Sequence, residues 1–204
     1  MTGTSLSAFM RRRIFEPLGM KDTGFTVPPA PLDRVASCYQ TDFVTGEITM
    51  LEETRNDLLA PPCVFEAGAG DRLVSTADDL LAFGRMMLNQ GAYGDERILS
   101  RLPVETMATD QLTTEQKAAS PFFENFWDSC GWGLGVSIVT RRDDVASVPG
   151  RYGWDGAFST SLYIYIDPHE DMVGVLMAQC RPGALRLPPV VLDFRTSADR
   201  AIDE

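Results

Sequence analysis

Residues 158–180 read FSTSLYIYIDPHEDMVGVLMAQC and carry the clearest strand signals in the sequence. Residues 158–166 are rich in aromatic and β-branched side chains, and residues 172–180 form a nearly continuous apolar run. Both patterns are typical of strands. The acidic residues 167–171 between them include a proline and have the length of a hairpin turn. The sequence therefore predicts two antiparallel strands joined by a five-residue turn.

The rest of the C-terminal part extends this sheet. Residues 131–139 alternate small or polar side chains with large apolar ones, which favours a third strand. Residues 192–202 suit a terminal helix, and the prolines at 188 and 189 delay its start. The inward side of this helix is expected to carry Leu192, Phe194 or Arg195, and Ala198.

The N-terminal part favours helices and loops. Ser5 can cap a first helix, which Pro17 and Gly19 end. Its apolar side is expected to hold Leu6, Phe9, Met10 and Ile14. Residues 25–65 contain five prolines and predict extended, loop-rich structure with short strands at 34–39 and 48–51.

A second helix is expected directly after residues 75–79, which contain overlapping capping-box patterns. Ser75 is interpreted as a cap of this helix rather than as a nucleophile. The buried stripe of the helix is predicted to contain Leu80, Phe83, Gly84, Met87 and Leu88, with Gly91 as its C-terminal stop. A third, shorter helix is expected from Ser100, with Pro103 in its first turn.

These elements together predict a single α/β domain of the α+β type over residues 1–204. Residues 1–128 are mainly helix and loop, whereas residues 129–204 supply the sheet strands and the C-terminal helix. A chain of this length can bury a substantial core.

The charge balance excludes several classes of partner. With 29 acidic and 18 basic residues the formal net charge is −11, which opposes binding to nucleic acid and to anionic membrane surfaces. The only basic run, residues 11–13, is interpreted as a solvated helix face. No apolar run approaches the ~20 residues of a membrane span, and no signal peptide is recognisable. We expect the chain as given to be soluble and cytoplasmic, with the compartment of the parent protein unassigned.

Metal and cofactor chemistry find no support in the sequence. The four cysteines, Cys38, Cys63, Cys130 and Cys180, are irregularly spaced, and their disulfide status stays open. His169 is the only histidine and lies in the acidic hairpin turn, where we expect it to be solvated rather than to act as the base of a triad. We therefore predict no metal site and no cofactor.

Four ordered blocks resemble the beta-lactamase and penicillin-recognising serine hydrolases. The first is IFEPLGMKDTGF at residues 14–25, and the others are residues 68–83, residues 131–135 with the sequence GWGLG, and residues 152–179. The likeness is strongest to the class C beta-lactamase-like, esterase-like branch and covers most of residues 5–182. It implies an antiparallel sheet with flanking helices beside a helical region.

The resemblance also implies an acyl-serine mechanism whose nucleophile this chain lacks. The family uses a Ser-x-x-Lys serine and a tyrosine of a Tyr-x-Asn motif to attack an ester or amide carbonyl. Here the residues three before Lys21 and Lys117 are Leu18 and Thr114, and no tyrosine begins a Tyr-x-Asn motif. The chain therefore resembles the C-terminal part of such a hydrolase, an incomplete domain that we expect to be inactive by itself.

The family's third motif matches Trp154, Asp155 and Gly156, which the resemblance assigns to substrate binding. By the same likeness the backbone N–H of Ala157 contributes to the oxyanion hole. Trp154 supplies no cation for a substrate carboxylate, which favours neutral esters over carboxylated beta-lactams. The alternative is a strand end and turn in which Trp154 fills the core. Core or loop packing is also the expectation for Trp127 and Trp132.

Two function hypotheses follow. The first is a serine hydrolase of ester or amide substrates, of which this chain forms one wall of the site. The second is a non-catalytic binding or scaffold module that kept the same fold. In the family the N-terminal strands pair with the last strand, so residues 172–180 are expected to expose an apolar sheet edge. A missing N-terminal half, or a second copy of the chain, is the partner expected there.

Overall fold

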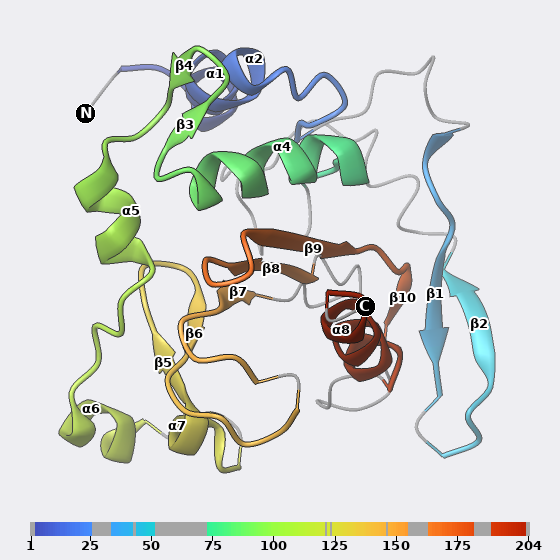
Figure 1. Cartoon of the computed structure of the whole chain (residues 1–204). Coiled ribbons are helices and arrows are strands. Elements are labelled where there is room, and N and C mark those ends of the chain that lie inside the picture. Colours follow the sequence, from blue (N-terminus) through green and yellow to red (C-terminus); the bar gives the residue numbers. More distant parts are fainter. Residues whose placement is uncertain are drawn as a thin grey trace.

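A five-stranded antiparallel sheet organises the C-terminal part of the computed structural model (Figure 1). The strand order is β5-β6-β7-β8-β9. The bounds are β5 Cys130–Trp132, β6 Ser137–Val139, β7 Tyr152–Trp154, β8 Tyr163–Asp167 and β9 Met172–Leu176. The structure describes residues 3–25, 34–42, 44–51, 73–120, 122, 124–145, 147–154, 163–181 and 189–202.

The predicted hairpin is confirmed as β8 and β9. Their register pairs Tyr163 with Leu176 and Asp167 with Met172, so the turn is one residue shorter than expected. The turn is stabilised by the Asp167 carboxylate, whose Oδ1 accepts hydrogen bonds from the backbone N–H groups of His169 and Glu170. Residues 158–162, the first part of the predicted strand, lie outside the described residues.

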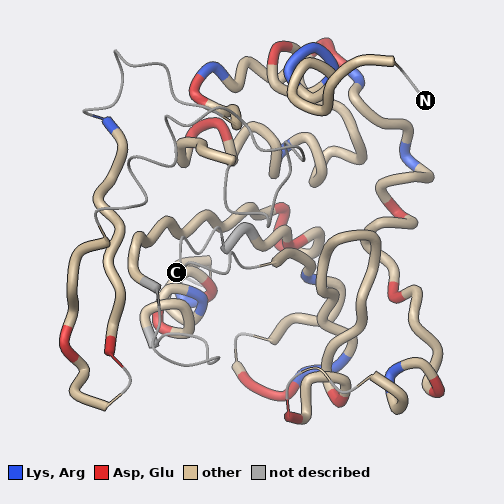
Figure 2. Tube along the Cα trace, turned by 180° about the vertical axis from the view of Figure 1, so that it is seen from behind, with Lys and Arg blue, Asp and Glu red and all other residues tan. Residues whose placement is uncertain are grey.

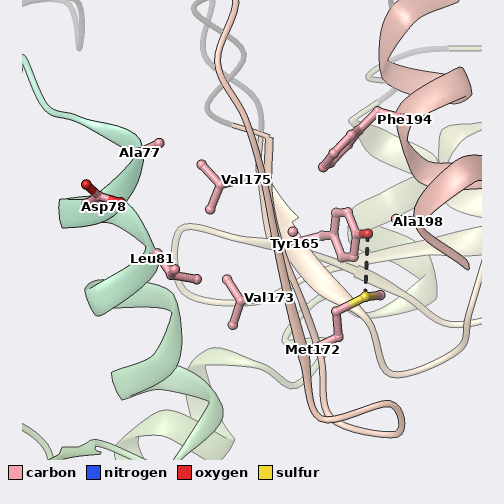
Figure 3. A pocket seen from close by; sticks show the side chains of 10 residues that line it. Ala77, Asp78, Leu81, Tyr165, Met172, Val173, Val175, Phe194 and Ala198 are labelled. Atoms are coloured by element: carbon pink, nitrogen blue, oxygen red, sulfur yellow. Dashed lines mark hydrogen bonds between the residues drawn. The ribbon is translucent and has the colours of Figure 1, made fainter. Parts of the chain in front are cut away.

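Helices cover the two faces of this hairpin. Helix α4, Ala77–Leu88, packs against one face, and helix α8, Pro189–Arg200, packs against the other (Figures 1 and 3). The alternation of strand side chains explains this arrangement. Ile166 belongs to the larger core cluster beneath α4, whereas its neighbour Tyr165 belongs to a second cluster with Val191 of α8. Tyr165 and Val191 are completely buried.

Helix α4 agrees with the prediction in its extent. Its N-cap is Thr76, whose side chain accepts the N–H of Asp79, so the expectation that Ser75 caps the helix is wrong. The helix ends at Leu88, and beyond it Gln90 and Gly91 both have positive φ. The Gly91 N–H donates to the carbonyl of Met86. The left-handed residue directly after the C-cap Asn89 is therefore Gln90, whereas the prediction placed the stop at Gly91, the next residue. Of the expected stripe, Leu80, Gly84 and Met87 are buried, and Phe83 and Leu88 pack against the core.

The N-terminal helix ends at Gly19, as predicted. Helix α1, Leu6–Met10, is capped by Ser5 as predicted and passes through a π-helical turn at Arg11–Phe15 into α2, Glu16–Leu18. Pro17 is tolerated within the first two residues of α2, and Gly19 with a φ of 68° ends it. The π-helical turn rotates the buried side, so Phe15 and Leu18 enter the core while Leu6 is exposed.

Two predicted strands are each divided. Residues 131–139 form the hairpin β5–β6, because Gly133 and Gly135 allow a tight turn. A Cβ atom at Gly133 would lie 1.8 Å from the Met107 carbonyl oxygen, and Gly135 has a φ of 84°. Residues 172–180 do not form one strand either. The chain leaves the five-stranded sheet after Leu176, and Cys180 begins β10, Cys180–Arg181, in another sheet.

That second sheet has the order β10-β1-β2, with β1 at Cys38–Thr41 and β2 at Ile48–Leu51. Strand β1 pairs parallel with β10 and antiparallel with β2. The expected strand at 48–51 is thus confirmed, and the one expected at 34–39 lies a few residues further along. A short hairpin of β3, Ala92–Tyr93, and β4, Glu96–Arg97, follows α4.

Three short helices lead into the large sheet. Helix α5, Arg101–Met107, begins after Ser100 as predicted and carries Pro103 in its first turn. Helices α6, Thr114–Ala119, and α7, Phe126–Ser129, were not predicted.

The C-terminal helix α8 differs from expectation in two respects, because it begins at Pro189 and because Leu192 is exposed. Phe194 and Ala198 pack inward as predicted, together with Val191.

Charged residues of both signs are distributed along the trace rather than gathered by sign (Figure 2). The arginines at positions 11–13 are exposed, in agreement with a solvated helix face. No helix in the described ranges is both long enough and apolar enough to cross a membrane. Within those ranges no cluster of three or more histidine, cysteine or acidic residues could hold a metal ion.

Candidate functional site

Trp154 is the last residue of β7 and pairs with Ile164 of β8. It is half-buried. The other residues assigned to the site by resemblance, Asp155, Gly156 and Ala157, lie outside the described residues. The part of the site that can be built from contacts is therefore the surroundings of Trp154.

Trp154 lies in a cluster of aromatic rings. Its ring centroid is 4.6 Å from that of Trp132 on β5, with an edge-to-face angle of 77°. The rings of Phe122 and Phe126 lie 5.7 and 6.2 Å from Trp154. Trp127 joins the group through Phe126, at 4.9 Å. These spacings are those at which aromatic pairs attract one another. We call these five residues, Phe122, Phe126, Trp127, Trp132 and Trp154, the aromatic cluster.

Asp110 holds the β5 side of the aromatic cluster. Its Oδ1 accepts the backbone N–H of Trp132 at 3.0 Å, and its Oδ2 lies 2.5 Å from Lys117 Nζ. Partial burial opposes ionisation of Asp110, but Lys117 and the amides of Trp132 and Leu112 outweigh this and lower its pKa. Gly131 permits the close approach, because a Cβ there would be 2.3 Å from Asp110 Cγ. The ammonium of Lys117 also lies 5.7 Å from the Trp127 ring centroid.

Arg151 anchors the other end of β7. Its Nη2 lies 2.8 Å from Oδ2 of Asp167, at the end of β8, and 2.7 Å from Oδ1 of Asp199 in α8. It also stacks on the Tyr165 ring at 4.6 Å. Burial disfavours the charge on Arg151, yet the two carboxylates outweigh burial and raise its pKa. A buried cation with two carboxylate partners fixes the strand that leads to Trp154.

Four other polar residues, Tyr152, Cys130, His169 and Ser75, lie outside the aromatic cluster. Tyr152 is buried, and burial raises the pKa of its phenol to about 12, which keeps the phenol protonated at neutral pH. Burial likewise raises the pKa of the Cys130 thiol. His169 is exposed in the β8–β9 turn, as expected for a solvated histidine. The hydroxyl of Ser75 is hydrogen-bonded to Thr23 at 2.7 Å.

The outer edge of β9 borders a groove. A cavity of about 370 Å³ lies between α4, β9 and α8, and Leu81, Val173, Val175 and Phe194 are among its lining residues (Figure 3). Among the described residues no strand pairs with this edge of β9. The Tyr165 hydroxyl, on the α8 side, lies 4.0 Å from Met172 Sδ.

The fold and the order of its elements are those of a beta-lactamase-like serine hydrolase. The beta-lactamase family model matches residues 1–190, and the chain belongs to that family. Protein Rv1367c of Mycobacterium tuberculosis is 37% identical over 180 residues, covering 83% of this chain and 42% of the relative. Penicillin-binding protein 4 of Amycolatopsis lactamdurans is 31% identical over 182 residues, covering 87% of this chain and 42% of the relative.

Among solved structures, simvastatin synthase (LovD) from Aspergillus terreus superposes with a TM-score of 0.76 at 20% identity. The match covers 98% of this chain and 50% of LovD. At this identity the similarity concerns the fold. The chain spans less than half the length of the curated relatives it matches and about half of LovD.

Sequence reasoning identified Trp154 but not the side chains around it. Trp127 and Trp132 were assigned to packing, and Phe122 and Phe126 were not singled out. Phe126 and Trp127 belong to α7 and Phe122 lies just before it, whereas Trp132 and Trp154 belong to β5 and β7. No local spacing marks these three segments as neighbours. Three tryptophans and three phenylalanines within residues 122–154 were the one available signal.

Proposed function

We propose that residues 151–157 form one wall of an acyl-serine hydrolase site for ester or amide substrates. The observation that supports this is the position of Trp154, at the end of a sheet strand in a beta-lactamase-family chain and beside half-buried aromatic rings. In the proposal, the backbone N–H of Ala157 donates to the developing oxyanion. Such a donor is worth about 3 kcal/mol of barrier. Gly156 lets the substrate approach the backbone closely.

The substrate proposed is a neutral ester. Trp154 stands where many family members carry a lysine, and an indole cannot pair with a carboxylate. The net charge of −11 adds a general repulsion of anions. Both features favour uncharged acyl compounds over carboxylated beta-lactams.

The nucleophile in this proposal is a serine outside these 204 residues, because the sequence has no Ser-x-x-Lys motif. The proposed role of the chain is to complete a site whose serine, lysine and tyrosine belong to another segment. A non-catalytic binding module is the second candidate, because a module of that kind does not need the Ser-x-x-Lys motif that the sequence lacks.

The direct test is the intact mass of the 22.5 kDa chain after incubation with a fluorophosphonate probe, and separately with a penicillin. We expect the unmodified mass in both reactions. A stoichiometric adduct on any serine would show that an activated nucleophile is present. The proposal that the nucleophilic serine lies outside these 204 residues would then be wrong.

The proposal also assigns a role to the free edge of β9. An unpaired strand edge is a template for another strand. In the groove of Figure 3, an added strand would receive backbone hydrogen bonds from β9 and bury side chains under α4 and α8. The proposed occupant is the segment that carries the nucleophile, with a second copy of the chain binding there in its absence.

A further inference from the structure

The aromatic cluster contains every tryptophan of the chain. The sequence has three, and Trp127, Trp132 and Trp154 all belong to this group. Two phenylalanines complete it. Phe122 contacts the other four rings, with centroids at 5.2 Å from Phe126, 6.2 Å from Trp127, 6.0 Å from Trp132 and 5.7 Å from Trp154.

This cluster differs from the hydrophobic core in its exposure. The core aromatics Phe15 and Tyr165 are 4% and 0% exposed, whereas Phe122 is 47% exposed. The three tryptophans are half-buried. Neither of the two buried core clusters includes any of the five rings. Core packing therefore does not account for the group, which presents partly open ring surface.

The position of the cluster relates it to the proposed oxyanion donor. Ala157 is three residues after Trp154, so the chain separates them by at most about 10 Å. In the proposal, the acyl substituent of a carbonyl held at the Ala157 amide extends towards Trp154 and its neighbouring rings. This step rests on the proposed function.

The charges around the cluster define the kind of substituent. Lys117, the cation at its border, is paired with Asp110 and lies over Trp127. The side chains of the cluster itself are uncharged. Flat rings at edge-to-face and tilted angles offer favourable surfaces to another aromatic ring.

We propose that the aromatic cluster is the acyl-group subsite and that it selects aromatic acyl groups of neutral esters. Phe122, the most open ring, supplies specificity by contacting the bound ring. Its role is separate from the chemistry at the carbonyl.

Tryptophan fluorescence tests this proposal on the chain as it exists, because all of the signal arises in the cluster. The probes are methyl benzoate and methyl cyclohexanecarboxylate, a matched pair that differs in the planarity of the ring. We expect saturable quenching with methyl benzoate and an affinity roughly two- to tenfold higher than for the cyclohexyl ester.

The variant Phe122→Leu keeps all three fluorophores and should abolish the preference for the aromatic ester. The matched control is Tyr39→Leu, which removes a similarly exposed aromatic ring, at 39%, from β1. Tyr39→Leu should leave both affinities unchanged. Equal affinities of the unaltered chain for the two esters, a linear response without saturation, or a preference that survives Phe122→Leu would overturn the proposal.

Binding is measured here without acylation, so the result is independent of the nucleophile. Failure of aromatic selectivity would remove the subsite and leave the hydrolase proposal in place. Failure of acylation in the complete site, with selectivity intact, would instead overturn the hydrolase proposal alone.

Discussion

Arg151 and Asp167 form a buried ion pair, with Nη2 2.8 Å from Oδ2 and side chains 2% and 0% exposed. The pair joins the residue before β7 to the last residue of β8, and Asp199 of α8 shares the same guanidinium. It thereby connects two sheet strands and a helix through one cation. Because Trp154 follows on β7, this contact supports the strand from which the proposed site continues.

Replacing Asp167 with asparagine should destabilise the fold strongly. The change removes one carboxylate partner of the buried guanidinium, and breaking buried pairs costs about 3 kcal/mol or more. Urea unfolding would measure the loss. The matched control is Arg34→Ala, which breaks an exposed pair with Asp22 and should have little effect. If the free energy of unfolding fell by a similar amount in both variants, the buried contact between Arg151 and Asp167 would not provide the stabilisation assigned to it.

Asp110 should make the fold sensitive to acid. Its folded-state pKa is below the ordinary value of 3.8, so its carboxylate stabilises the fold above about pH 4. This contribution is lost as the pH falls through the folded-state pKa. In urea titrations, the free energy of unfolding of the unaltered chain should exceed that of Asp110→Asn by less at pH 3 than at pH 6. Asp95→Asn, in the exposed β3–β4 turn, is the control, and a constant gap for Asp110→Asn would contradict the interpretation.

Gly84→Ala should destabilise α4, although alanine is the better helix former. A Cβ at Gly84 would lie 2.4 Å from Val173 Cγ1 on β9, and valine has little rotamer freedom with which to move away. We expect a loss of about 1–3 kcal/mol, as for other overpacked cores. The double variant with Val173→Ala should recover part of it. Additive effects in this double-mutant cycle would mean that the two elements do not pack as described.

The edge of β9 should promote self-association when no other segment covers it. Light scattering over a range of concentrations should therefore detect dimers or larger species. Val175→Lys places a charge in the edge groove and should shift the population towards monomer. Val190→Lys, on the exposed side of α8, is the matched control and should not. A monodisperse monomer with cooperative unfolding in the unaltered chain would contradict the partner proposal.

Capping and turn residues in the sequence predicted the helices and strands that begin or end at them. Helix α4 was found from its capping pattern and Gly91, and the β8–β9 hairpin from its acidic turn. Helix α6 could also have been found, because Thr113 and Gln116 form a complete capping box. The prediction failed where alternation continued across a tight turn, as in the β5–β6 hairpin, where Gly133 is required by the nearby Met107 carbonyl.

The site was predictable only in part. Trp154 was identified through family resemblance, since a tripeptide at a strand end has no distinctive local pattern. Its aromatic neighbours depend on how the α6–α7 region meets β5 and β7, which is a tertiary relationship. The same holds for Arg151, whose partners Asp167 and Asp199 are 16 and 48 residues away in the chain.

Fluorophosphonate labelling of a reconstituted site tests whether residues 151–157 belong to the active site. A segment that carries a Ser-x-x-Lys motif, taken from a beta-lactamase-family hydrolase, would be fused ahead of residue 1. In a folded fusion, we predict a single adduct on the serine of that motif, and a much slower reaction when Gly156→Val blocks the proposed wall. No adduct, or labelling that Gly156→Val leaves unchanged, would contradict the assignment of residues 151–157 to the active site.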